Sequence, residues 1–225
     1  MQDKQVPTGV LGTAYVKDRQ SGALKYRLRR RAQEVIDSVN KYGKSSGDLL
    51  DLGPAEGKSL SIVQDAFPQM RCVGLEYSQD LIDACTDSRL KIIQGDAMEP
   101  PFEDESFDTV SATAIIEHVA SPKGMLLEVF RILRPGGIVI ITTPDPFFEH
   151  IATAIGHLKD EDHQETMTLK KLRKYFKETG FEPLVLEKFM CSPWGFPGEH
   201  TIENIMKKIG LGFLLLNQLA VAKKP

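Results

Sequence analysis

A glycine turn after a short apolar run is the strongest chemical signal in the sequence. The segment LLDLGPAEG places Asp51 in an expected buried strand, with Gly53 and Gly57 in the turn that follows. Glycine there allows positive φ or a close approach of the backbone to a ligand. The turn lacks the middle glycine that seats a pyrophosphate in GxGxxG, and Asp51 would repel phosphate. These features favour a nucleotide-like ligand with a cationic amine or sulfonium; the alternative is a purely structural turn.

Two further carboxylates follow expected strands. Glu76 comes directly after the run RCVGL, where an acid can accept hydrogen bonds from both hydroxyls of a ribose. Asp96 follows the next strand, where a carboxylate can accept from an exocyclic adenine amine while Ala97 and Met98 supply backbone and an apolar wall. The carboxyl ends of parallel strands meet at one edge of a sheet, so we expect all three acids to point into one crevice.

Apolar runs alternate with amphipathic segments along the chain. Short apolar runs, of which those at 106–112 and 138–143 are rich in β-branched residues, predict strands at 48–52, 71–75, 90–94, 106–112, 138–143, 183–190 and 211–222. Apolar residues at spacings of three and four predict helices at 22–43, 58–67, 79–86, 121–133, 168–179 and 199–209. Ser78 and Thr168 are expected to cap two of these helices and Pro122 to stand in the first turn of another. Gly136 and Gly137 are expected to end the helix before the strand at 138–143.

This alternation predicts an α/β fold with a doubly wound sheet. Strands joined by helices run parallel with right-handed crossovers. The segment IVIITT is nearly all β-branched, as in a central strand covered on both faces. Such sheets bind ligands at the carboxyl ends of their strands, which is where the three acids are expected.

These motifs resemble those of the class I S-adenosylmethionine-dependent methyltransferases, in particular the type 11 subfamily. The match runs from about Leu49 to Pro144 and more loosely to the end of the chain. LLDLGPAEG resembles the first family motif, commonly DxGxGxG, with Ala55 in place of the middle glycine. Residues 134–137 resemble the LRPGG turn before the fifth strand. The resemblance implies a Rossmann-like sheet of seven strands, mostly parallel, with an antiparallel last strand beside the fifth and helices on both faces.

The resemblance also implies S-adenosyl-L-methionine as cofactor and a set of binding residues at the strand ends. Glu76 matches the ribose-binding acid, and the segment from Gly95 to Val110 matches the adenine-side motif and the fourth strand. Glu117, His118 and Val119 resemble a family element after that strand. The expected cofactor-binding residues are Asp51, Gly53, Pro54, Ala55, Gly57, Glu76, Tyr77, Asp96, Ala97, Met98, Thr113, Ala114, Glu117 and His118.

Methyl transfer needs alignment of the acceptor and, for some acceptors, removal of a proton. His118 is the leading candidate for a base because imidazole titrates near neutrality; the alternative is that Glu117 and His118 shape the cofactor pocket. His150, His157 and His163 are further candidates from a presumed lid at 147–165. Relatives in the subfamily methylate mostly small molecules, and segments 144–150 and 190–198 suit the wall of an apolar or amphipathic acceptor pocket.

Length and composition fit one domain over residues 1–225. We divide it into an N-terminal helical extension (1–47), a cofactor-binding half (48–144) and a part with lid, acceptor side and C-terminal strands (145–225). No apolar run approaches the roughly 20 residues of a membrane span, and no secretory signal is evident, so we expect a cytoplasmic protein.

Other residue patterns limit the partners. Three scattered cysteines, without a CxxC pair, predict reduced thiols and no metal site. A net charge of −3 and the absence of NPPY after the fourth strand disfavour nucleic acid. The basic segment KYRLRRR could contact phosphates or an acidic substrate, or form the solvated face of a helix. The oligomeric state is not indicated.

Two other functions are compatible with the same sheet. A nicotinamide-dependent oxidoreductase shares the ribose acid, but GPAEG and the lack of a Tyr-x-x-x-Lys set count against it. A protein that binds S-adenosylmethionine without catalysis would retain every cofactor residue. Turnover separates this second alternative from an enzyme.

Overall fold

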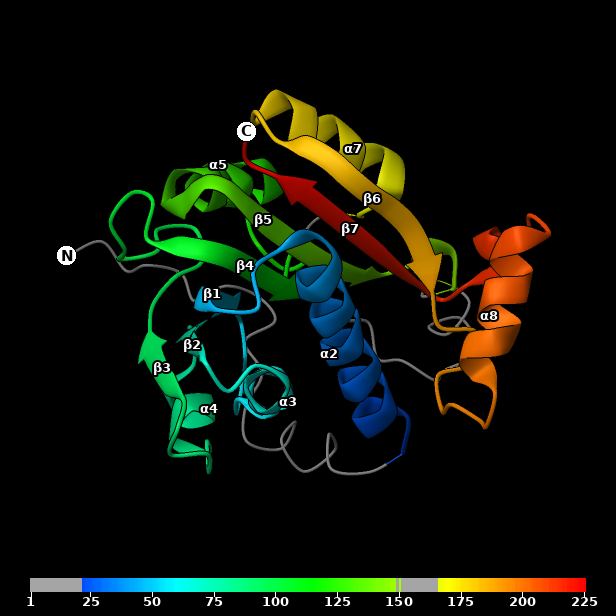
Figure 1. Cartoon of the computed structure of the whole chain (residues 1–225), viewed down its shortest axis with the longest axis horizontal. Helices are drawn as coiled ribbons and strands as arrows, with labels where there is room; N and C mark the ends of the chain where they lie inside the picture. Colours follow the sequence, from blue (N-terminus) through cyan, green and yellow to red (C-terminus); the bar gives the residue numbers. More distant parts are fainter. Residues whose placement is uncertain (1–21, 149, 151–165) are drawn as a thin grey trace.

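A seven-stranded sheet forms the centre of the computed structural model, which describes residues 22–148, 150 and 166–225 (Figure 1). Its strands are β1 (Gly47–Leu52), β2 (Met70–Glu76), β3 (Lys91–Gln94), β4 (Phe107–Thr113), β5 (Leu133–Pro144), β6 (Glu182–Phe189) and β7 (Asn217–Lys223). Their order in the sheet is β3-β2-β1-β4-β5-β7-β6. This confirms both the α/β fold and the seven-stranded arrangement that the family resemblance implied.

The direction of β7 also agrees with the prediction. β1 pairs in parallel with β2 and β4, and β4 pairs in parallel with β5. β7 runs antiparallel between β5 and β6, with Val221 opposite Ile140 on one side and Val185 on the other. The carboxyl ends of β1, β2, β3, β4, β5 and β6 therefore share one edge of the sheet.

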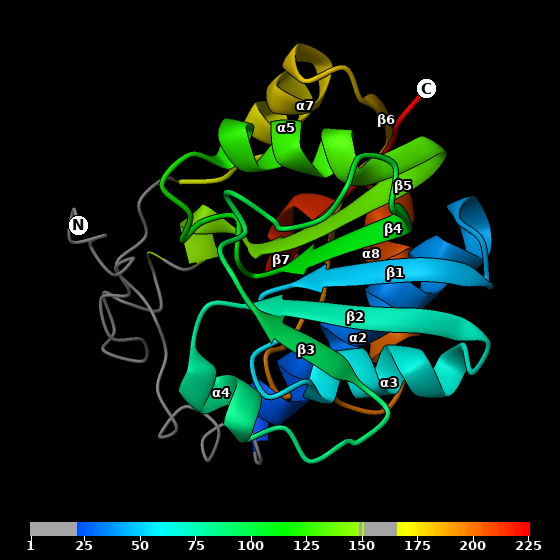
Figure 2. The same cartoon turned by 90° about the vertical axis from the view of Figure 1, so that its left-hand side faces the viewer.

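Helices cover both faces of the sheet, as Figure 2 shows. α2 and α3 lie on one face, and α5 and α7 lie on the other. The helix bounds are α2 (Gly22–Tyr42), α3 (Lys58–Ala66), α4 (Gln79–Asp83), α5 (Pro122–Ile132), α7 (Leu169–Glu178) and α8 (Glu199–Lys208), with a 3₁₀ turn η1 (Gly212–Leu214). Among these described helices, none has the length and hydrophobicity to cross a bilayer.

Each face of the sheet has its own apolar core. On the α2 side, Ala32 and Val35 pack with Leu49 and Ile140. On the α5 side, the buried residues include Met125, Leu126 and Val129, together with Leu172 and Phe176 of α7. The predicted helical stripes are the buried faces of α2 and α5, so hydrophobic periodicity located both helices correctly.

Three predicted boundaries are wrong. β5 begins at Leu133 rather than 138, because Leu133 pairs with Phe107 before the register shifts and Thr109 pairs with Ile138. Gly136 and Gly137 thus lie inside the strand's span, where Gly136 adopts φ +80° and its amide donates to the carbonyl of Lys224. A local bend in a paired strand has taken the place of the expected turn.

The last strand, β7, and the helix α4 are shorter than expected. Residues 211–216 precede β7, because the amides of Leu214 and Leu215 donate back to Leu211 and Gly212 and form a 3₁₀ turn. α4 ends at Asp83 instead of residue 86. At its N-terminus, the side chain of Ser78 makes no capping hydrogen bond. Thr168 does cap α7, accepting from the amide of Lys171.

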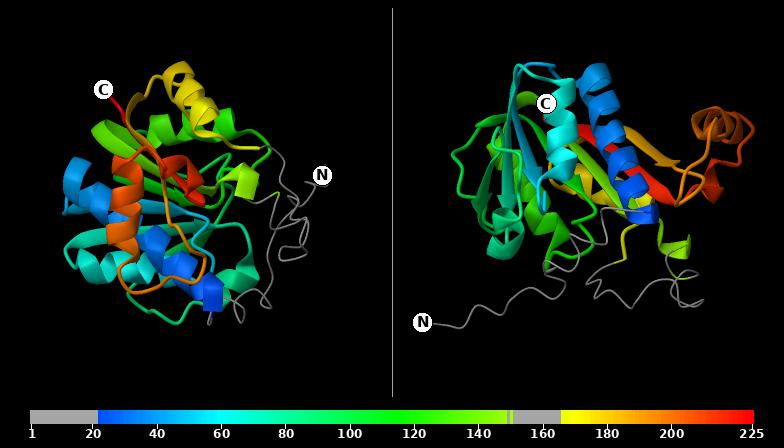
Figure 3. Two further views of the ribbon diagram at one scale, coloured as in Figure 1. Left: turned by 90° about the vertical axis from the view of Figure 1, so that its right-hand side faces the viewer. Right: turned by 90° about the horizontal axis from the view of Figure 1, so that it is seen from below.

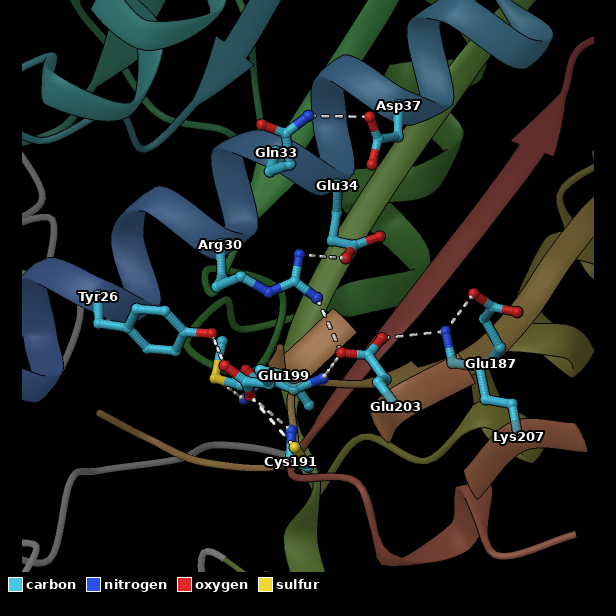
Figure 4. Close-up of polar contacts among 12 residues, drawn as sticks. Tyr26, Arg30, Gln33, Glu34, Asp37, Glu187, Cys191, Glu199, Glu203 and Lys207 are labelled. Carbon is cyan, nitrogen blue, oxygen red and sulfur yellow. Dashed lines mark hydrogen bonds and ion pairs between the residues drawn. The ribbon is translucent and has the colours of Figure 1, made fainter. Parts of the chain in front are cut away.

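A buried polar cluster joins α2 to α8 (Figure 4). Arg30 is 5% exposed and lies 2.9 Å from Glu34 and 3.0 Å from Glu203. Tyr26 donates to Glu199. The basic segment KYRLRRR is therefore not simply a solvated face, since Arg30 is committed to carboxylates inside the protein.

Burial raises the pKa of one carboxyl group in this cluster. Desolvation, with repulsion from Glu203, raises the pKa of Glu34 from 4.5 to about 7, against the attraction of Arg30 and Lys207. The unfolded chain loses this proton near pH 4.5, whereas the folded chain keeps it to about pH 7. Unfolding between these values releases a proton, so stability falls as the pH rises through this window.

We expect Glu34→Gln to remove this loss of stability. In the wild type, titration of Glu34 should lower the free energy of unfolding by about 3 kcal/mol between pH 4.5 and 8, whereas the neutral amide of Gln does not titrate. Urea unfolding at pH 5 and pH 8 measures the difference. The exposed Asp80→Asn on α4 is the control, because Asp80 does not act on Glu34. Equal pH dependence in wild type and Glu34→Gln would contradict the titration.

Candidate functional site

The turn after β1 is left-handed at three of its residues. Gly53, Ala55 and Gly57 adopt φ of +68°, +52° and +79°. The amide of Gly53 donates to the carbonyl of Leu75 at 2.9 Å, which ties the turn to β2. The two glycines thus adopt the positive φ expected of them, and Ala55 adopts a conformation that usually selects glycine.

Glu76, at the end of β2, fixes this turn. The side chain is buried, one carboxylate oxygen accepts from the amide of Ala55 at 2.9 Å, and the other accepts from the amide of Ser78 at 3.0 Å. A carboxylate offers about four acceptor positions, so each oxygen retains one for a ligand hydroxyl. The geometry therefore suits an acid that holds its own loop and a ribose together.

Asp51 lies beneath the turn, 2% exposed. It stands opposite Ser111 of β4, whose hydroxyl donates to it at 2.7 Å. Burial and the nearby Asp51 raise the pKa of the Cys72 thiol to about 12. This keeps Cys72 protonated, and all three cysteines are free, as predicted.

The loop after β3 lies next to Glu76. The amide of Gly95 donates to the Glu76 carbonyl at 2.9 Å. Asp96 accepts from the amide of Met98 at 2.8 Å, which closes a tight turn over Ala97. Asp96 is partly buried and Ala97 is 8% exposed, so this loop offers a carboxylate beside an apolar surface.

Other predicted residues occupy the same edge of the sheet. Pro54 is buried, and its carbonyl accepts from the amide of Gly57. Tyr77 is partly buried, and its carbonyl accepts from the side chain of Gln94. Both residues belong to the loops that Glu76 joins.

The segment after β4 contributes a second strained turn. Thr113 pairs with Thr142, and Ala114 adopts φ +56° while its amide donates to the carbonyl of Thr142 at 2.7 Å. Glu117 is 3% exposed and His118 is partly buried. The amide of His118 donates to the carbonyl of Ile115, which fixes the start of this segment.

Three of the four described non-glycine residues with positive φ lie at this edge, the fourth being Glu105 before β4. Ala55, Ala114 and Met190 follow β1, β4 and β6 respectively, and each has positive φ. Each such residue costs about 1 to 2 kcal/mol relative to ordinary backbone. Strain retained at several strand ends on one side of a sheet is typical of ligand-binding loops.

Two polar partners at this edge were not foreseen. Ser111 could have been suspected only as a hydroxyl within an apolar strand. Asp145 is 7% exposed at its side chain and forms an ion pair with Lys188 at 2.6 Å across β7. Neither residue has a local sequence signal, because each partner comes from a distant strand.

The predicted lid lies largely outside the described residues. His157 and His163 fall in the segment 151–165, and His150 is described as exposed. Within the described ranges, no three His, Cys, Asp or Glu side chains are grouped to bind a metal ion. The strand-end loops therefore remain the candidate site.

The LRPGG element serves the opposite edge of the sheet. Arg134 donates to Asp108 at 2.5 Å and to Asp48 at 2.8 Å. Hydrogen bonds from Arg71 and Arg134 help hold the pKa of Asp48 below its usual range despite partial burial. Arg134 thus joins β1 and β4 at their amino ends, away from the candidate site.

Comparison with known proteins matches this architecture to one family. A family model described as a methyltransferase domain matches residues 24–186. A relative from Mycolicibacterium smegmatis, named a probable S-adenosylmethionine-dependent methyltransferase, is 30% identical over 51% of this chain and 45% of its own. A demethylmenaquinone methyltransferase from Oceanobacillus iheyensis is 24% identical over 68% of this chain and 77% of its own. The chain therefore spans under half of the first relative.

A solved structure shows the same fold. It belongs to a complex between the Haloferax volcanii Trm112 methyltransferase activator and a methyltransferase. The TM-score is 0.71 at 19% identity, with 95% of both chains covered. At this identity the likeness concerns the fold alone.

We expect Gly53→Ala to destabilise the turn beyond the cost of positive φ. A Cβ at Gly53 would lie 2.7 Å from Cδ1 of Ile115, whereas a Cβ at Gly198, with φ +83°, would meet nothing within 4 Å. Gly198→Ala is therefore the matched control for backbone strain. Urea unfolding should show an extra loss of about 1 kcal/mol for Gly53→Ala; equal losses would mean that Ile115 moves aside freely.

Proposed function

The chain belongs to the methyltransferase domain family, and from that premise we propose that it transfers the methyl group of S-adenosyl-L-methionine to a small-molecule acceptor by in-line displacement. The observation that carries the proposal is the position of Glu76, whose carboxylate and carbonyl bind the loops after β1, β2 and β3. Three loops held by one acid make a preorganised site at the carboxyl edge of the sheet.

The loops divide the cofactor between them. The free acceptor positions of Glu76 would receive the two ribose hydroxyls. Asp96 would accept from the adenine amine, with Ala97 and Met98 beside the ring. Pro54, Tyr77 and the turn from Gly53 to Gly57 would surround the remainder, and Asp51 would balance the positive amine or sulfonium from below.

The reaction demands little acid or base from the protein. S-adenosylmethionine supplies an electrophilic methyl on its sulfonium. The segment after β4, with Thr113, Ala114 and Glu117, would hold the acceptor side of the cofactor pocket and align the acceptor. His118 would take a proton from an acceptor that must lose one.

A small acceptor agrees with the relatives and with the surface. The Oceanobacillus relative is named for demethylmenaquinone, a quinone and not a macromolecule. Phe147 is 65% exposed directly beyond β5, and Trp194 and Phe196 are 60% and 41% exposed beyond β6. These side chains supply apolar surface in the two segments predicted to contact the acceptor.

We expect Glu76→Gln to weaken S-adenosylhomocysteine binding at least about tenfold, close to 1.4 kcal/mol. The amide nitrogen of Gln would face a backbone N–H and would remove one acceptor for ribose. Isothermal titration calorimetry measures this, with the exposed Asp80→Asn as control. Tight binding of a nicotinamide cofactor by the wild type, without S-adenosylhomocysteine binding, would support an oxidoreductase instead.

Turnover with a panel of small acceptors should release S-adenosylhomocysteine, and His118→Asn should lower kcat. A lost general base costs about a hundredfold, and the acidic limb of the pH profile should disappear with it. The exposed His200→Asn is the control. Weaker cofactor binding with an unchanged pH profile would assign His118 to the pocket wall, and binding without any turnover would favour a non-catalytic protein.

A further inference from the structure

α8 buries acidic side chains and exposes isoleucines. Glu199 and Glu203, one helical turn apart, are each 3% exposed. Ile202 and Ile205 on the outer faces of α8, and Ile209 at its C-cap, are 44%, 50% and 63% exposed. Surface helices normally bury the apolar stripe and expose the acids, so a specific set of contacts must hold α8 in this orientation.

Those contacts belong to the polar cluster that Figure 4 shows. Glu203 accepts from Arg30 at 3.0 Å and from the amide of Met190 at 3.1 Å. Glu199 accepts from the amides of Cys191 and Ser192 at 2.9 Å and 3.0 Å. Both carboxylates are thus satisfied inside the protein, and rotating the helix would break every one of these bonds.

The segments beside α8 extend its apolar face. Gly195 packs on the ring of Tyr26, where a Cβ would lie 2.3 Å from a ring carbon, so the loop before α8 is held against α2. α8 stands at one extremity of the molecule (Figures 1 and 3). We call this set the α8 surface: Trp194, Phe196, Ile202, Ile205, Ile209, Leu211, Phe213 and Leu214, all between 39% and 63% exposed.

The charge beside the α8 surface is positive on balance: Lys207 and Lys208 stand against Glu187, whose side chain is 45% exposed and pairs with Lys207. Between residues 190 and 216 the acids are Glu199 and Glu203, and both are buried. Lys208 is exposed, and Lys207 contacts Glu187 and Glu203. An apolar face with aromatic side chains and an outward lysine complements a negatively charged lipid surface.

We propose that the α8 surface seats the protein on an anionic bilayer. α8 would lie in the interfacial plane with its isoleucines in the acyl boundary, as amphipathic helices without spanning length do. Lys208 adds electrostatic attraction to anionic headgroups. The polar cluster gives the helix this orientation before it meets lipid. Trp194 and Phe196 also belong to the segment predicted to contact the acceptor, but vesicle binding itself requires no methyl transfer, so its test needs no acceptor.

Tryptophan fluorescence can report lipid binding by this chain. Trp194 is its single tryptophan and lies on the α8 surface, 60% exposed. Mixing the protein with vesicles of equal parts phosphatidylglycerol and phosphatidylcholine should shift Trp194 emission to shorter wavelength and sediment the protein with the vesicles. Phosphatidylcholine alone should give weaker binding, because Lys208 has no anionic headgroup to meet.

Paired variants locate the contact. Ile205→Ser combined with Ile209→Ser should lower vesicle partitioning at least about tenfold. Leu127→Ser on α5 is the matched control, since Leu127 is equally exposed at 50% but stands outside the α8 surface. Lys208→Glu should reduce binding to anionic vesicles selectively. These side chains are exposed, so the melting temperature should change little. Binding is measured below the melting temperature of each variant, because unfolding itself changes Trp194 emission.

The same experiments distinguish a bilayer from other partners of the α8 surface. No shift of Trp194 emission and no sedimentation with anionic vesicles would overturn the proposal. Self-association that Ile205→Ser abolishes, without vesicle binding, would assign the α8 surface to a second copy of the chain. Vesicle binding that Leu127→Ser lowers as much as the α8 pair would place the contact elsewhere and would equally refute it.

Discussion

The backbone bonds of Glu76 are the constraint on which the candidate site depends. Its two oxygens hold the amides of Ala55 and Ser78, and its carbonyl holds the amide of Gly95. Bonds from amides to a charged acceptor contribute about 1.5 to 3 kcal/mol each. That range covers the cost of the left-handed conformation at Ala55. An alanine can therefore stand at the middle glycine of the motif that the sequence resembles, because the neighbouring strand stabilises the turn it forms.

Local patterns in the sequence were enough to locate the strands and helices, since most of them carry their own apolar period and a glycine or proline boundary. The antiparallel last strand was implied by the family resemblance alone. Local patterns could not predict pairing between distant segments. The start of β5 depends on Leu133 meeting Phe107, and the partner of Asp51 is Ser111 because β1 and β4 settle in that register. The sequence thus located the loops of the site through their strand ends, whereas the contacts that fix those loops required the three-dimensional structure.

α8 shows a different limit. Its amphipathic pattern predicted a helix at the right place, yet periodicity alone would turn Ile202 and Ile205 inward. The observed orientation depends on Arg30, over a hundred residues earlier in the chain, and on the amides beyond β6. Partners of that kind decide which face of a helix is buried, because turning α8 over would leave Arg30 and the buried amides without their carboxylate acceptors.

The polar cluster has a cost in stability, which Glu34 shows. Burial raises the pKa of this carboxyl group to about 7. Arg30 must serve both Glu34 and Glu203, and a well-packed apolar contact between α2 and α8 would serve stability at least as well. An apolar contact would, however, leave α8 free to bury its isoleucines against α2. Buried ions that determine orientation at some expense in stability are consistent with a helix whose exposed face has a use. The polar cluster and the α8 surface are therefore two consequences of a single arrangement: acids inward, isoleucines outward.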